Sequence, residues 1–178
     1  MGVKNDAWIR RMALNKKMIE PFVDHKVREG VVSYGLSSYG YDFRLGNRFL
    51  VPCGGTGDPK NPGAAEYREV EKLSEIPPNS HVIGTSLEYF RIPENVITIT
   101  QGKSTYARIG VMVNITPFEP GWEGQATISI VNVSSMPVRI YPGEGIAQIL
   151  FFEGDEPPVH KYRGRYQATR DITLPDIQ

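Results

Sequence analysis

The sequence has few of the residues that build metal sites and covalent cross-links. It contains one cysteine, Cys53, and three histidines among 178 residues. A single cysteine excludes an internal disulfide. His25, His81 and His160 lack the close spacing of zinc ligands, so we expect no structural zinc. Cys53 precedes two glycines in a loop-like stretch with no base nearby in sequence, and we expect it to be an ordinary thiol.

An excess of charge and long apolar runs are missing as well. Twenty Lys and Arg balance twenty Asp and Glu, which argues against a general nucleic-acid binder and a polybasic membrane anchor. The longest apolar stretches, such as Ile146–Phe152, fall far short of the roughly 20 residues of a membrane helix. Residues 1–6 have neither the apolar core of a secretory signal nor the serine or threonine that myristoylation prefers at position 6. We expect a cytoplasmic protein with no membrane and no nucleic-acid partner.

The composition indicates one domain over residues 1–178, and the pattern near its start predicts a helix. A content of 40% hydrophobic and 22% charged residues is typical of a single globular domain of this length. Between residues 5 and 17 apolar side chains recur every three or four positions behind a possible cap at Asn5 or Asp6, which predicts an amphipathic helix. The apolar positions are Trp8, Ile9, Met12 and Ala13.

The rest of the chain has a mostly β pattern. Past Pro21, runs rich in β-branched and aromatic residues alternate with prolines and glycines, of which the chain has 14 and 18. The predicted strands are Tyr41–Leu45, Arg48–Val51, His81–Ser86, Phe90–Ile92, Val96–Thr100, Val111–Asn114, Gln125–Asn132, Val138–Ile140 and Ile146–Phe152. Nine short strands indicate a sandwich or a barrel. The segment 54–65, with four glycines and two prolines, is expected to be an exposed excursion.

One stretch, Gly102–Arg108, carries groups suited to phosphate. Its first four residues imitate the end of a P-loop, but that motif requires a glycine where Ile97 stands. Lys103, Ser104 and Arg108 still offer two cations and a hydroxyl to a phosphate chain. The alternative is a polar turn that leads into a short helix.

Three further stretches leave a structural and a functional interpretation open. In the rigid loop Thr116–Gly124, Glu119 and Glu123 are either ligands for a sugar hydroxyl or a hydrated metal, or solvated turn carboxylates. Gln148 interrupts an apolar strand and should be hydrogen-bonded, to the protein or to a ligand. The tail 159–178 either closes over an anionic ligand or is a solvated terminus, which its composition favours. Its basic and aromatic residues are Lys161, Tyr162, Arg163, Arg165, Tyr166 and Arg170.

Four stretches, in this order and spacing, resemble the bacterial dCTP deaminase family. They are Ser37–Arg44, Gly102–Arg108, Thr116–Gly124 and Glu144–Phe152. The resemblance implies a dUTPase-like distorted β-barrel or jelly roll with an N-terminal helix, and a homotrimer with active sites between subunits. It also implies hydrolytic deamination of dCTP to dUTP and ammonia, with dUTP or dTTP as further ligands. Mg²⁺ would be bound through the triphosphate, and the lone cysteine excludes the zinc site of other deaminases.

The resemblance also assigns site residues. It implies that Lys103, Ser104 and Arg108 hold phosphates and order the catalytic water, that Glu119 contacts the deoxyribose and that Tyr162 contacts the nucleotide. The backbone around Thr116 and Pro117 would cradle the pyrimidine. The other positions that it places in the nucleotide site are Thr105, Thr127, Ile128, Arg165 and Thr169.

The chain departs from the family at the residue that moves protons. The family strand reads Thr-Leu-Glu-Phe-x-Asn, and here Ser129 occupies the position of the glutamate that acts as general base and acid. A serine hydroxyl does not titrate near neutral pH. Loss of the glutamate therefore forfeits roughly 10²- to 10⁴-fold of catalysis. In the tail, Arg165 and Thr169 replace the family's lysine and glutamine.

Three functions therefore remain open. The chain is a dCTP deaminase in which another carboxylate replaces the glutamate, an enzyme that deaminates or hydrolyses a different or modified deoxynucleotide, or a regulatory paralogue that binds a nucleotide without turnover.

Overall fold

The computed structural model describes residues 2–160 and 162–175 and confirms the N-terminal helix, α1, over Asp6–Lys16. Asn5 caps it, because its side chain accepts a hydrogen bond from the backbone N–H of Trp8 at 3.1 Å. Ile9 and Ala13 are buried against the sheet. The 3.6-residue period of the apolar side chains thus fixes which face of α1 packs on the core.

Strands make up most of the remaining structure. They are β1 Gly2–Val3, β2 Ile19–Glu20, β3 Lys26–Val27, β4 Tyr34–Leu36, β5 Tyr41–Gly55, β6 Ala65–Glu71, β7 Glu75–Ile76, β8 Ser80–Arg91, β9 Val96–Gly102, β10 Val111–Asn114, β11 Glu123–Asn132, β12 Val138–Arg139 and β13 Gly145–Glu153. Two short helices, the 3₁₀ turn η1 Pro62–Ala64 and α2 Ser104–Ala107, complete the described elements. In the part of the chain that the structure describes, no helix has the length and apolarity to cross a membrane.

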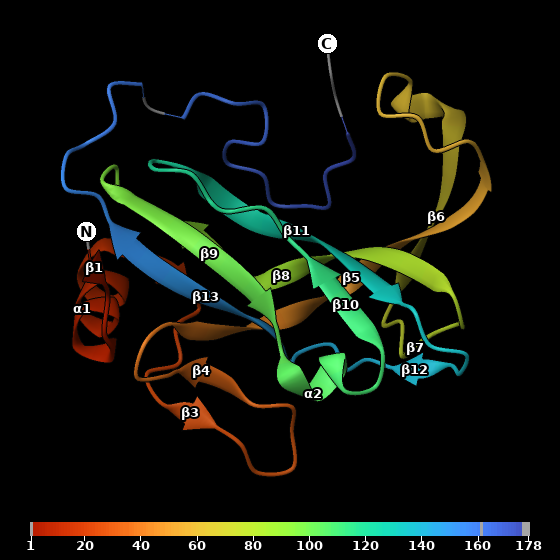
Figure 1. Ribbon diagram of the computed structural model, residues 1–178, viewed down its shortest axis with the longest axis horizontal. Helices are drawn as coiled ribbons and strands as arrows, with labels where there is room; N and C mark the ends of the chain where they lie inside the picture. The colour runs from red at the N-terminus through yellow and green to blue at the C-terminus, as the bar shows by residue number, and fades with distance from the viewer. Residues whose placement is uncertain (1, 161, 176–178) are drawn as a thin grey trace.

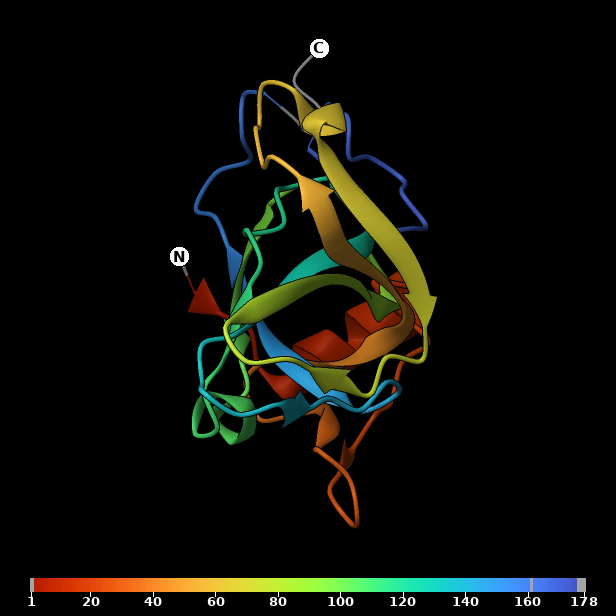
Figure 2. The same cartoon turned by 90° about the vertical axis from the view of Figure 1, so that its right-hand side faces the viewer.

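The principal sheet runs in the order β1-β13-β5-β8-β11-β10, with β4, β6 and β9 pairing at its sides. Figure 2 shows that it curls into a half-barrel with α1 against one end. The mostly β, curled architecture with an N-terminal helix agrees with the predicted fold class.

In two places, a pair of predicted strands forms one long strand in the structure. Tyr41–Leu45 and Arg48–Val51 are both part of the 15-residue β5, which bends between them at a register shift. Gly46 permits this bend, since a Cβ there would lie 2.9 Å from the carbonyl oxygen of Thr85. His81–Ser86 and Phe90–Ile92 merge in the same way in β8. The polar and glycine residues that signal turns here mark bends inside strands instead.

An exposed hairpin arm, formed by β5 and β6, projects from the sheet (Figure 1). Residues 56–64 form its tip, so the segment 54–65 is an exposed excursion as predicted. Cys53, however, lies in β5 beside the bulge between Pro52 and Gly54, and not in a loop. Its side chain is exposed, which leaves the thiol open to solvent.

Candidate functional site

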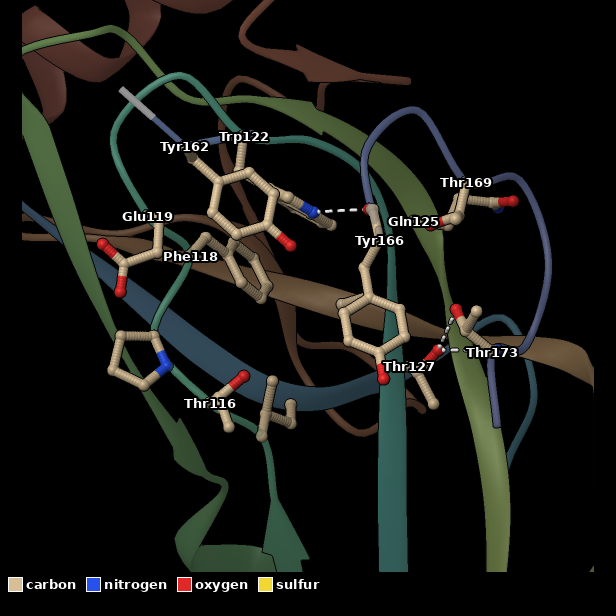
Figure 3. Close-up of a pocket in the computed structure, with 13 residues that line it drawn as sticks. Thr116, Phe118, Glu119, Trp122, Gln125, Thr127, Tyr162, Tyr166, Thr169 and Thr173 are labelled. Atoms are coloured by element: carbon tan, nitrogen blue, oxygen red, sulfur yellow. Dashed lines mark hydrogen bonds between the residues drawn. The ribbon is translucent and has the colours of Figure 1, made fainter. Parts of the chain in front are cut away.

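A pocket of about 450 Å³ lies between the loop 115–122, one face of β11 and the C-terminal tail (Figure 3). Its walls combine aromatic rings with threonine hydroxyls. The lining residues are Ile115, Thr116, Pro117, Phe118, Glu119, Trp122, Gln125, Ala126, Thr127, Tyr162, Tyr166, Thr169 and Thr173. Apolar walls with a few convergent polar groups are typical of a small-molecule site.

A series of aromatic rings in tilted contact connects the pocket to the core. Phe90 packs against Phe118 with ring centroids 5.3 Å apart, and Phe118 packs against Trp122 at 4.6 Å. The backbone N–H of Phe118 also donates to the hydroxyl of Thr98 at 2.7 Å. The loop 115–122 is therefore held to the barrel by its own aromatic side chains, and the pocket wall is rigid.

Strand β11 contributes Gln125, Ala126 and Thr127 to the pocket lining. Ala126 and Ile128 point into the protein, whereas Gln125, Thr127 and Ser129 lie half-buried on the opposite face. Ser129 is two residues beyond Thr127 on this face and pairs with Asn114 of β10 and Ile83 of β8. It lies next to the pocket wall without being one of its lining residues.

The C-terminal tail closes one side of the pocket. The indole N–H of Trp122 donates to the carbonyl of Tyr166 at 2.8 Å, and the N–H of Gln125 donates to the carbonyl of Thr169 at 2.9 Å (Figure 3). Further on, the N–H of Thr173 donates to the hydroxyl of Thr127 at 3.0 Å. The tail between residues 162 and 173 is therefore attached to the barrel at several points, although most of its residues are exposed. Composition misses the docking because the tail attaches chiefly through backbone groups.

The tail residues singled out in the sequence differ in position. Tyr162 and Thr169 line the pocket, and Tyr162 also packs against the core. Arg165 is exposed and lies outside the lining. Lys161 and positions 176–178 lie outside the described residues.

The two loop carboxylates have different surroundings. Glu119 is exposed at the mouth of the pocket. Glu123 is not one of the lining residues, and its Oε2 atom lies 3.6 Å from Nε of Arg91. Among the described lining residues, Glu119 alone carries a charge. In residues 2–160 and 162–175 no group of three His, Cys, Asp or Glu side chains is arranged to hold a metal ion.

The phosphate-like stretch is a turn into the four-residue helix α2, outside the pocket of its own chain. Ser104, Thr105 and Arg108 are exposed, and an Nη of Arg108 donates to the hydroxyl of Ser104 at 3.1 Å. Lys103 instead points inward and donates to the carboxylate of Asp42. Tyr106 anchors the helix in the core, where burial raises the pKa of its phenol to about 12.

Two further residues singled out in the sequence, Gln148 and Ile128, have their side chains in contact with the protein itself. Gln148 is half-buried and donates to the hydroxyl of Ser37 at 3.0 Å, so its amide has the expected partner, which belongs to the protein. Ile128 has its side chain in the core, so that its backbone alone borders the pocket face. Sequence reasoning missed the pocket roles of Phe118, Gln125 and Thr173, for which no local motif signals a site.

Known proteins match the whole chain. The profile of a family described as dCTP deaminase-like matches residues 3–154. A dCTP deaminase of Herpetosiphon aurantiacus is 53% identical over 184 aligned positions, which cover 99% of this chain and 100% of the relative. A dCTP deaminase of Campylobacter concisus is 51% identical, with 99% of each chain covered.

Two solved structures share the fold. The crystal structure of 2'-deoxycytidine 5'-triphosphate deaminase from Agrobacterium tumefaciens superposes with a TM-score of 0.67 at 19% identity. The match covers 86% of this chain and 48% of that one, so this chain spans about half its length. The dUTPase of Staphylococcus bacteriophage 80alpha gives a TM-score of 0.50 at 12% identity and covers 82% of this chain. These likenesses confirm the dUTPase-like fold.

Proposed function

Because the chain belongs to the dCTP deaminase-like family, we propose that it binds dCTP and converts dCTP and water into dUTP and ammonia. The observation that carries the proposal is the pocket between the loop 115–122, β11 and the tail. Its volume lies within the range of small-ligand sites. Aromatic rings offer stacking surfaces to a pyrimidine, and Thr116, Thr127 and Glu119 offer hydrogen bonds to the base and sugar.

A triphosphate needs cations that this pocket lacks within one chain. The described lining contains no lysine or arginine. Ser104, the first residue of α2, and Arg108, its C-cap residue, are exposed and lie outside this lining. We therefore propose that a neighbouring copy supplies α2, in a homotrimer with one site at each interface. Exposed apolar side chains on β9, on β10 and in the turn after α2 support this assembly, because a second copy would bury them. They are Ile99, Ile109 and Met112.

Mg²⁺ fits such a site as a companion of the nucleotide. The cation prefers phosphate oxygens and water with few protein ligands, and the described residues offer no three-ligand cluster of their own. Bound in this way it would neutralise phosphate charge, while Ser104, Arg108 and the pocket walls orient the nucleotide.

Proton transfer is the step for which this chain is least equipped. Attack of water at C4 of cytosine requires a group that accepts the protons of the water in turn and delivers one to the ring nitrogen and one to the leaving amine. Ser129 stands at the family's glutamate position, and Glu119 is the remaining pocket carboxylate among the described lining residues. Ser129 thus favours a second candidate function, nucleotide binding without turnover.

Product analysis by mass spectrometry distinguishes the two functions. Purified protein is incubated with Mg²⁺ and a panel of deoxynucleoside triphosphates that includes 5-substituted cytosines, with Arg108→Ala as the control. Deamination exchanges an amino group for an oxygen, whereas pyrophosphate release removes two phosphates. Formation of dUTP supports the deaminase, and calorimetric binding of dCTP without product supports the silent paralogue. Absence of both binding and product contradicts both functions.

A further inference from the structure

A buried ion cluster lies directly beneath α2. Asp42, on β5, is 3% exposed, and its Oδ2 atom forms ion pairs with the amines of Lys103 and Lys26. The two lysine side chains are themselves only 10% and 17% exposed. Three segments far apart in the sequence therefore meet at one carboxylate: β5, β3 and the residue that precedes α2.

We propose that Asp42 is a positioning residue for phosphate recognition, which acts by holding Lys103 and thereby fixing the residues of α2 that face the triphosphate. This inference rests on the proposed nucleotide function. It assigns Lys103 a supporting role beneath the helix, and leaves the direct phosphate contacts to Ser104, Thr105 and Arg108.

Among the residues that the structure describes, Asp42 is the one acidic residue that forms an ion pair with Lys103. The N–H of Lys103 donates to the carbonyl of Ile146 at 3.2 Å, which ties the start of α2 to β13. Gly145 leaves room for the lysine stem, because a Cβ there would lie 3.2 Å from Cδ of Lys103 and 2.0 Å from the carbonyl oxygen of Ser33. The missing side chain at position 145 thus leaves space for the Lys103 side chain to reach Asp42.

A helix of four residues depends on such anchors, because it makes too few internal hydrogen bonds to be stable alone. One anchor is Tyr106 in the core, whose hydroxyl accepts from the N–H of Tyr141 at 3.3 Å. The other is the Lys103–Asp42 pair. Without the carboxylate, a buried ammonium loses its counter-charge and leaves the interior, and the N-terminal end of α2 moves with it.

The charge balance of the cluster points to an anion nearby. Two ammonium groups share Oδ2 of one carboxylate, which leaves the cluster with an excess positive charge. Burial lowers the pKa of Lys26, Asp42 raises it and the charge of Lys103 lowers it further. The excess positive charge lies under the segment that presents Ser104 and Arg108, where a triphosphate would offset it.

The test compares dCTP with deoxycytidine, which lacks phosphates, by calorimetry and ligand-observed NMR on Asp42→Asn. We expect the affinity for dCTP to fall by about tenfold or more while deoxycytidine binding stays unchanged. Amide hydrogen exchange of Ala107 and Arg108 should become faster. Asp58→Asn, a matched change at the exposed hairpin tip, should alter none of these quantities.

A double-mutant cycle keeps the inference falsifiable if Asp42→Asn folds poorly. Asp42→Asn combined with Lys103→Met removes the charges of Asp42 and Lys103 together and leaves Lys26 in place, and its loss of dCTP affinity should equal that of Lys103→Met alone. Additive losses, equal losses for dCTP and deoxycytidine, or unchanged α2 exchange would overturn the positioning role. Failure of the unmodified protein to bind dCTP would instead refute the proposed function itself.

Discussion

Ser129 stands where the resemblance to the dCTP deaminase family places a catalytic glutamate, and it lacks a titrating carboxylate. It shares the pocket face of β11 with Thr127 and is half-buried between Asn114 and Ile83. A longer side chain at this position extends along the face toward the pocket, because alternate residues of a strand point the same way. The backbone that would present a carboxylate is therefore intact.

Ser129→Glu should raise dUTP formation from dCTP by roughly 10²- to 10⁴-fold, the usual contribution of a positioned general base and acid. The rate is measured as ammonia release or by chromatography of the product. Ser129→Gln has the same length without a titrating group and should give no gain. If the glutamate variant binds dCTP but remains as slow as the unmodified protein, more than the base is missing.

Tyr106 makes the stability of the folded protein depend on pH. Burial raises the pKa of its phenol to about 12, whereas the unfolded chain titrates near 10.0. The folded state therefore keeps a proton that the unfolded state loses, so this contribution to stability is complete below pH 10 and declines as pH rises toward 12. At about pH 11 the loss amounts to about 1.4 kcal/mol.

Urea unfolding of the unmodified protein and of Tyr106→Phe at about pH 8 and pH 11 checks this expectation. The phenylalanine variant should show a smaller decrease in the free energy of unfolding between the two values, by about 1.4 kcal/mol. Parallel decreases in both proteins would mean that the phenol is not protected in the folded state.

Among the elements, the docked tail depends on a hydrogen bond whose loss can be measured at one backbone amide. The N–H of Thr173 has one hydroxyl acceptor, Thr127, and the two side-chain oxygens are 3.2 Å apart. Thr127→Val removes that acceptor at nearly constant shape. Exchange of the Thr173 amide, followed by NMR, should accelerate by about fivefold, since a hydrogen bond contributes about 1 kcal/mol.

Thr173→Val is the matched control, because it removes the tail hydroxyl and leaves the amide acceptor in place. Its exchange rate at position 173 should stay close to that of the unmodified protein. Equal acceleration in both variants would show that the tail is held by side-chain hydroxyls in general, and not by the backbone bond to Thr127.

The elements also show which features the sequence predicts. Helix α1 follows from a cap at Asn5 and a regular apolar period, both of which are local. Strand β6 was missed because its exposed edge carries Glu66, Arg68 and Glu69, which hide the alternation. The docking of the tail was missed because its main acceptors are backbone carbonyls, such as that of Tyr166, and these have no residue-specific signature.

At the scale of the whole molecule, the residues predicted for the site form two separate groups. Thr116, Glu119 and Tyr162 line the pocket, whereas Ser104 begins α2 and Arg108 is its C-cap residue. Motif order along the chain predicts both groups, but it contains no information about which copy of the chain completes which site.

An interface variant tests the composite site. Met112 is 61% exposed on β10 and lies outside the pocket lining. Met112→Glu should reduce the mass in light scattering from three times 19.9 kDa to one chain and abolish dCTP binding at the same time. Leu14→Glu, at a 65% exposed position on α1, should change neither. A monomeric Met112→Glu protein that binds dCTP as before would contradict a site shared between copies.

The exposed position of Cys53 makes the hairpin arm a natural point for chemical labelling. It is the one thiol of the chain, so a maleimide spin label attaches to a single place without any prior removal of cysteines. The arm also adjoins the tail, because Arg48 pairs with Glu69 of β6 and with Asp171. Pulsed electron paramagnetic resonance between labels on neighbouring copies would then report both the geometry of the assembly and any movement of the arm when a nucleotide binds.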